Sequence, residues 1–186
     1  MSYREDIWRF EALNEQEAVD QRLMLEWIRR DGDAILRREN LGAHMTASAL
    51  VLNPARTKVL LVFHNQFLSW SWVGGHTDGE ADLLGAAVRE ALEETGLTRA
   101  DPLTRGIVSL DVLPVWGHKK NGRYVPSHLH LNAAFALSAP ETQPLRVKPD
   151  ENSGVRWVSV KQLEQYVTEP PMLSIYEKIL GRLACL

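Results

Sequence analysis

Hydrophobic residues recur at helical spacing in the first part of the chain. Between Leu13 and Arg38 there is no proline, charged residues are frequent, and apolar side chains return about once per helical turn. A glycine between two acids, Asp31-Gly32-Asp33, interrupts this pattern. We therefore expect one or two helices, broken near Gly32, that form an extension packed on the rest of the chain as a scaffold or a dimer contact.

The pattern becomes that of β-strands at residue 44. Residues 44–53 are rich in β-branched and apolar side chains and stop at Asn53-Pro54, and residues 57–64 repeat this character after a short turn. Two such segments separated by a turn are typical of neighbouring strands. We expect them to form a hairpin.

A shorter alternating segment follows at residues 67–73. Apolar and small polar residues alternate there, which predicts one short strand with Trp70 and Trp72 on the same side. The strand leads directly into Gly74-Gly75. A tryptophan pair at this place is either core or a surface on which a base stacks.

The second half of the chain continues to mix strands and helices. Apolar patterning predicts strands at 106–116, interrupted at Pro114, at 128–137 and at 155–160, a polar loop at 117–127, a short helix after 158 and an amphipathic helix over 170–183. The alternation lacks the regular βαβ period of a parallel sheet. We therefore expect an α/β fold in which a mixed β-sheet lies between helices.

Length, composition and charge limit the class of protein. The 186 residues and 45% hydrophobic content suit one globular domain with appended elements. A net charge of −3 argues against a protein that coats nucleic acid but is compatible with a nucleotide substrate. No segment has the length of a membrane span, and the charged N-terminus has no apolar signal core, so we expect a cytoplasmic protein. With one cysteine, Cys185, neither a disulfide framework nor a cysteine zinc site can form.

The strongest chemical signal lies between Gly74 and Leu97. After a polar turn this stretch becomes helical, with Glu90, Glu93 and Glu94 at positions i, i+3 and i+4. Their carboxylates converge on one helix face and repel one another unless a positive charge lies between them. Oxygen ligands suit a hard divalent cation, so the pattern predicts a Mg²⁺ or Mn²⁺ site.

The same stretch resembles the Nudix hydrolase family. The family's motif begins at Gly75, continues with Arg89-Glu90 and Glu93-Glu94 in register, and closes with Gly96-Leu97. One position departs from the motif, because its first glutamate falls on Ala81. We expect Glu80 or Asp82 to support Arg89 in its place, or Arg89 to pair with Glu93.

The resemblance implies a fold and an activity. It implies an α/β/α sandwich around a mixed sheet, and hydrolysis, with Mg²⁺ or Mn²⁺, of a nucleoside diphosphate linked to another group. Nucleotide sugars, ADP-ribose-like compounds and nucleoside triphosphates all fit that description. We divide the chain into an N-terminal helical extension (1–42), the Nudix domain (43–160) and C-terminal helices packed on it (161–186).

Roles for individual residues follow from the motif and its surroundings. Glu93 and Glu94 are the predicted primary metal ligands, and Glu90 is either a further ligand or a residue that orients water. Arg89 is predicted to hold Glu93 or the preceding loop. Glu151 is the first candidate for a general base, because many Nudix enzymes place an acid in this connection; Asp150, or a strand histidine, is the alternative.

Candidate substrate contacts surround the motif. A polar pocket is predicted from Gly75, His76, Trp72, His128 and His130. Each also has an ordinary explanation as a packed or solvated side chain.

Two other functions are compatible with the resemblance. A non-catalytic Nudix-like sensor would bind a nucleotide ligand and regulate a partner, but an intact trio of acids argues for catalysis. An isoprenoid diphosphate isomerase typically uses a core cysteine, and Cys185 is terminal. Apolar stripes on the terminal helices further suggest a homodimer.

Overall fold

The computed structural model describes residues 2–120 and 122–185. Among these residues, eight strands form one mixed sheet around the neighbouring strands β1 and β9, which run parallel. The strands of this sheet are β1 (Ala43–Leu52), β2 (Lys58–His64), β3 (Ser69–Ser71), β4 (Val73–His76), β5 (Asp101–Pro102), β6 (Ser109–Val115), β9 (His128–Ser138) and β10 (Asn152–Ser159). Its main path runs β10-β2-β1-β9-β5, while β3 pairs with β2, β4 with β1 and β6 with β9.

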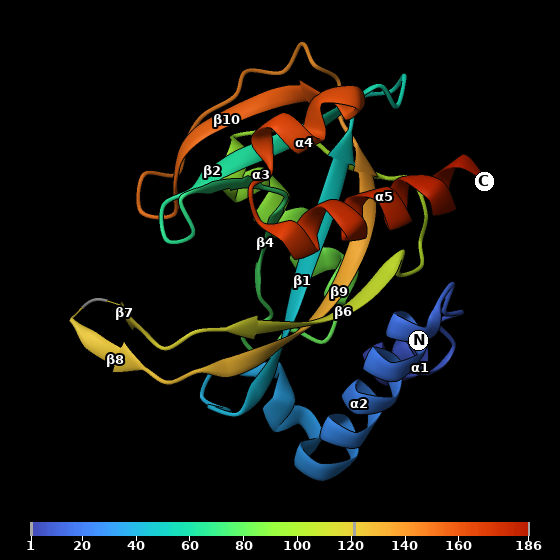
Figure 1. Ribbon diagram of the computed structural model, residues 1–186, viewed down its shortest axis with the longest axis vertical. Helices are drawn as coiled ribbons and strands as arrows, with labels where there is room; N and C mark the ends of the chain where they lie inside the picture. Colours follow the sequence, from blue (N-terminus) through green and yellow to red (C-terminus); the bar gives the residue numbers. More distant parts are fainter. Residues whose placement is uncertain (1, 121, 186) are drawn as a thin grey trace.

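Helices cover both faces of the sheet (Figure 1). They are α1 (Tyr3–Trp8), α2 (Glu15–Asp31), the 3₁₀ turn η1 (Gly32–Leu36), α3 (Leu83–Thr95), the 3₁₀ turn η2 (Val160–Gln162), α4 (Leu163–Tyr166) and α5 (Pro170–Ala184). One apolar core lies under α3 and the N-terminal helices, and a second lies under α5. The result is the expected α/β/α sandwich.

The strand β1 belongs to both cores. Its ten residues are all buried, and alternate side chains enter opposite cores, with Ala47 and Ala49 on the α3 side and Leu50 and Leu52 on the α5 side. Because the strand is covered on both faces, even its polar residues His44, Thr46 and Ser48 are buried.

The N-terminal extension is tied to the sheet and to α5 by buried charges. Glu17 on α2 is completely buried and accepts from Arg182 at 2.8 Å, while Lys178 lies 3.2 Å from it. Lys178 also donates to Asp111 on β6 at 2.7 Å. Three elements far apart in sequence therefore share one ionic network.

Most of the predicted elements are present, and the exceptions have local causes. Proline 114 does not interrupt β6, because that strand pairs only with β9 and an edge strand tolerates a missing N–H. The segment 67–73 does not continue as one strand: β3 pairs with β2, whereas β4 pairs with β1. The short helix α1, which begins in a capping box of Ser2 and Glu5, was not expected.

The stretch 117–127 contains a hairpin rather than a loop. Strands β7 (His118–Lys120) and β8 (Arg123–Val125) pair with each other and project from the body of the molecule (Figure 1). Their turn includes Gly122, whose φ of +75° is readily adopted by glycine. Gly122 was the available sequence signal for a turn here. In the part of the chain that the structure describes, no helix is long and apolar enough to cross a membrane.

Candidate active site

The helix α3 places the acidic residues. It begins at Asp82, whose side chain accepts from the N–H of Gly85 at 3.0 Å, and it ends at Gly96 in the left-handed conformation with φ of +74°. Its apolar side chains, such as Ala87 and Ala91, pack into the core under the sheet. Glutamate 90 lies beside this apolar face and is consequently carried toward the sheet.

Two glycines allow the backbone of β4 to approach these acids. A Cβ added to Gly75 would lie 2.6 Å from the carboxyl carbon of Glu90, and one added to Gly74 would lie 2.7 Å from the Cα of Ser48. The N–H of Gly74 donates to Glu94 at 3.3 Å. Gly75 is therefore required by close packing against the helix acid Glu90, and Gly74 by close packing against β1.

Three carboxylates converge beside this strand. One oxygen each of Glu90, Glu94 and Glu151 lies within 4.8 Å of the other two. Glu90 and Glu94 are only 7% and 4% exposed. Burial raises the pKa of Glu94 to about 8, with a further contribution from Glu90, and burial also raises the pKa of Glu90.

The cluster fits a hard divalent cation. Its donors are carboxylate oxygens, the ligand type that Mg²⁺ and Mn²⁺ prefer, and they are close enough together to share one ion. Two of the three are nearly buried, so the charge of the ionised form needs a positive partner. We take the fit as good for Glu90, Glu94 and Glu151.

Glutamate 93 lies beside this cluster rather than in it. Its side chain is 46% exposed and lies 3.4 Å from Lys148 and 3.9 Å from Arg89. Lys148 also pairs with Glu151 at 3.0 Å, and so links α3 to the loop before β10. The role of Glu93 as a metal ligand stays a prediction, while the position of Glu151 near the helix acids supports including it among the site residues.

Asparagine 152 fixes the end of α3 against β10. Its side-chain N–H donates to the backbone carbonyl of Glu94 at 2.9 Å, and the residue is 1% exposed. Because Glu151 precedes it directly, this bond fixes the backbone next to the third acid. Neither Asn152 nor Lys148 carries a sequence signal that would single it out among ordinary polar loop residues.

Arg89 shows how the chain accommodates Ala81. The guanidinium donates to Glu90 at 2.6 Å and to Glu80 at 3.4 Å, and it lies 3.5 Å from the backbone carbonyl of His76. Glu80 therefore supports the arginine from a position one residue before Ala81. Asp82 instead caps the helix. Of the alternatives expected from sequence, Glu80 makes the shorter contact, and Glu93 is farther away at 3.9 Å.

Histidines form a second group at the neighbouring strand ends. The rings of His44, His76 and His130 have centres 4.9 to 5.1 Å apart, and His128 lies against His44 and His130. Burial, followed by the neighbouring His76, lowers the pKa of His130 to about 2, and burial lowers the pKa of His44. His44 was not expected in this pocket, because the sequence of β1 does not reveal which strands lie beside it.

Trp72 belongs to the core rather than to an open binding surface. It is 8% exposed, its ring packs against Tyr176 with centres 5.5 Å apart, and its backbone N–H donates to the tyrosine hydroxyl at 2.8 Å. Little of the indole face is left for a base. The expected substrate contact of Trp72 is therefore corrected to a packing role.

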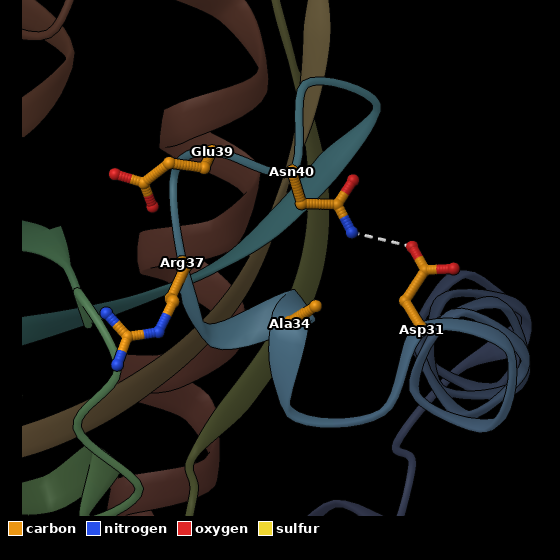
Figure 2. A pocket seen from close by; sticks show the side chains of 5 residues that line it. All are labelled: Asp31, Ala34, Arg37, Glu39 and Asn40. Atoms are coloured by element: carbon orange, nitrogen blue, oxygen red, sulfur yellow. Dashed lines mark hydrogen bonds between the residues drawn. The ribbon is translucent and has the colours of Figure 1, made fainter.

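Two cavities lie elsewhere on the molecule. One of about 360 Å³ is lined by residues from the end of α2 to the start of β1, including Arg37 and the hydrogen-bonded pair Asn40 and Asp31 (Figure 2). Another of about 310 Å³ lies between α1, Arg182 and Gly106. Neither is lined by the three acids, so the chemistry of the carboxylates, rather than cavity size, identifies the candidate site.

Comparison with known proteins places the chain in a family. The family model described as the NUDIX domain matches residues 42–179. No curated protein sequence gives a significant match.

Solved structures share the fold at low sequence identity. A Nudix hydrolase from M. smegmatis, RenU, is 19% identical with a TM-score of 0.58, covering 78% of this chain and 88% of its own. The E. coli dihydroneopterin triphosphate pyrophosphohydrolase is 15% identical with a TM-score of 0.54, covering 74% and 95%. An Ap4A hydrolase from C. elegans is 17% identical with a TM-score of 0.50, covering 76% and 98%.

Proposed function

Because the chain belongs to the NUDIX domain family and is thus a hydrolase of pyrophosphate bonds, we propose that it cleaves a nucleoside diphosphate linked to another group, using Mg²⁺ or Mn²⁺. The observation that carries this proposal is the convergence of Glu90, Glu94 and Glu151 within 4.8 Å. Two of these acids are nearly buried and adjoin a glycine pair that lets the backbone come close.

The clustered acids are suited to bind a divalent metal ion. Glu90 and Glu94 would hold it, Glu93 is a further candidate at the edge of the group, and Glu151 lies close enough to act on a water molecule beside the ion. Such an ion supplies positive charge that offsets the negative phosphate oxygens and favours attack by water. Mg²⁺ and Mn²⁺ both accept this ligand set.

The remaining chemistry belongs to side chains. Hydrolysis requires a water molecule to attack phosphorus while a base accepts its proton. Glu151 is the proposed base, because it is less buried than the two helix acids and lies in a connection outside α3. Asp150 is exposed and is the second candidate, and His128 or His130 is the third.

Arg89 has a positioning role in this proposal. It donates to Glu90 at 2.6 Å and also contacts Glu80, so it fixes the acid and the loop before the helix together. Its guanidinium is occupied by protein acids and is therefore better placed to orient Glu90 than to bind a phosphate.

The proposed substrates are defined by the diphosphate group that they contain. Nucleotide sugars, ADP-ribose-like compounds and nucleoside triphosphates share this group. The names of two structural relatives add Ap4A and dihydroneopterin triphosphate to the compounds to be tried. Gly75, His76, His128 and His130 are the proposed substrate contacts in the adjoining pocket.

A nucleotide-binding sensor without catalysis is the alternative function. The experiment that separates the two is turnover of this substrate panel with Mg²⁺ or Mn²⁺ and with chelator, measuring phosphate, pyrophosphate and nucleoside monophosphate. The proposal expects metal-dependent release of one of these products. Tight binding of a nucleotide without any turnover would contradict it and favour the sensor.

A further inference from the structure

Three histidines from different strands meet beside the acidic site. His44 on β1 and His130 on β9 are direct partners in the parallel register, and His76 on β4 pairs with Thr46, two residues along β1. A ring nitrogen of each histidine lies within 4.8 Å of those of the other two. The sheet itself therefore assembles the group.

The hydrogen bond of His44 determines which of its nitrogens is available. Its Nδ1 lies 3.0 Å from the backbone carbonyl of Asn40, and a carbonyl can only accept, so in the neutral ring Nδ1 carries the proton. The other nitrogen, Nε2, consequently has a lone pair. It is buried, and no hydrogen-bond partner is found for it among the described residues. Histidine ligands of metals typically show this arrangement, with one ring N–H held by a carbonyl or carboxylate.

A neighbouring histidine presents a second lone pair. The Nδ1 of His128 lies 2.8 Å from the carbonyl of Pro126, so by the same reasoning its Nε2 is unprotonated and accepts from the Nε2–H of His130 at 3.2 Å. The Nδ1 of the neutral His130 ring consequently carries a lone pair. A phosphate oxygen also carries lone pairs, so it would be repelled by the unprotonated histidine nitrogens. A cation would instead be attracted to them.

The ring spacing agrees with a shared ion. With metal–nitrogen bonds of about 2.1 Å at the tetrahedral angle, the centres of two imidazoles on one ion lie about 5 Å apart. The observed ring centres are 4.9 Å apart for His44 and His76, and 5.1 Å apart for each of them and His130.

We propose that His44, His76 and His130 form a second metal site, for a transition-metal ion of the Zn²⁺ type. Imidazole nitrogen suits Zn²⁺, Co²⁺ and related ions, whereas Mg²⁺ and Mn²⁺ favour the oxygen ligands of the acidic cluster. The two sites thus differ in chemistry. His76 and His130 are only partly buried, which leaves a fourth coordination position open to a ligand from solution.

Co²⁺ binding tests this site directly, because tetrahedral Co²⁺ absorbs strongly in the visible range and octahedral Co²⁺ on carboxylates does not. Protein stripped with chelator is titrated with Co²⁺ and then with Zn²⁺. We expect one equivalent of strongly absorbing Co²⁺ that Zn²⁺ displaces. The absence of this absorption in the wild-type protein would overturn the proposal.

Variants locate the ion. His130→Asn and, separately, His76→Asn should weaken Zn²⁺ binding at least about tenfold, with circular dichroism to show that each variant is folded. His118→Asn, a nearby histidine outside the trio, should bind as the wild type does. Glu94→Gln should keep the Co²⁺ absorption even if it loses hydrolysis. Wild-type affinity in both trio variants, or an equal loss in His118→Asn, would overturn the assignment.

Discussion

At the scale of single residues, Gly75 has no room for a side chain. Its φ is not in the left-handed region, so the constraint is space rather than backbone conformation. The space that a side chain would need is filled by the carboxylate of Glu90. The motif glycine and the motif acid therefore depend on each other.

Gly75→Ala should displace Glu90 and disturb the acidic cluster. An added Cβ would lie 2.8 Å from both carboxylate oxygens, so the side chain or the strand must shift. We expect turnover to fall at least about tenfold with the fold retained. Gly106→Ala is the matched control, because nothing lies within 4 Å of its added Cβ. Steady-state rates and circular dichroism check both variants, and unchanged turnover in Gly75→Ala would contradict the packing argument.

The raised pKa of Glu94 predicts how stability depends on pH in chelator. Burial raises the pKa of Glu94 in the folded protein to about 8, from an ordinary value of 4.5. Protonation of Glu94 therefore contributes to the stability of the folded protein. This contribution is fully present below pH 4.5, the pKa of the carboxyl group in the unfolded chain, and it is lost as the pH rises through about 8.

Denaturant unfolding of the wild type and Glu94→Gln at several pH values measures this effect. Glutamine resembles the protonated acid at every pH, so the variant should become more stable relative to the wild type by up to about 5 kcal/mol between pH 4.5 and 8. Added Mg²⁺ should recover stability in the wild type at high pH. A difference between the two proteins that does not change with pH would contradict the buried acid.

At the scale of elements, the N-terminal extension is joined to the rest of the fold by charge. Glu17 on α2 and Asp111 on β6 both pair with Lys178 on α5. Both acids are nearly inaccessible, at 0% and 2%. An ion network of this kind holds elements in one arrangement, because each charge is costly without its partners.

Lys178→Met should destabilise the protein by about 3 kcal/mol, because it leaves buried carboxylates without one of their cations. Lys58→Met provides the comparison. Lys58 pairs with Glu141 at the surface, where removal of the pair should cost less than about 1 kcal/mol. Thermal and denaturant unfolding measure both changes, and equal costs would show that the buried network is not important for stability.

At the scale of the whole molecule, most helices and strands could be predicted from the sequence. Strand and helix periods predicted β1, β2, β9, α2, α3 and α5, because these elements bury regular apolar faces. The division of 69–76 into two strands was missed, since it depends on two different pairing partners that one strand's own sequence does not reveal. The domain boundaries at 42 and 160 stay predictions, as do the homodimer and the cytoplasmic location.

The candidate site was predictable only in part, and for a similar reason. Helical spacing placed Glu90 and Glu94 on one face, but the same spacing also favoured Glu93, which the structure turns toward Lys148. The third acid of the cluster, Glu151, is brought in by the pairing of β10 with β2. Residues joined by long-range strand pairing, such as His44 and His130, leave no local pattern in the sequence.

The most direct test of the central claim is the rate of pyrophosphate hydrolysis by Glu94→Gln with Mg²⁺, on a substrate that the wild type turns over. Loss of this buried carboxylate should lower the rate at least on the order of 10²-fold. Glu164→Gln, an exposed acid on α4, should retain the wild-type rate. A near-wild-type rate in folded Glu94→Gln would contradict the assignment of the acidic cluster as the catalytic metal site.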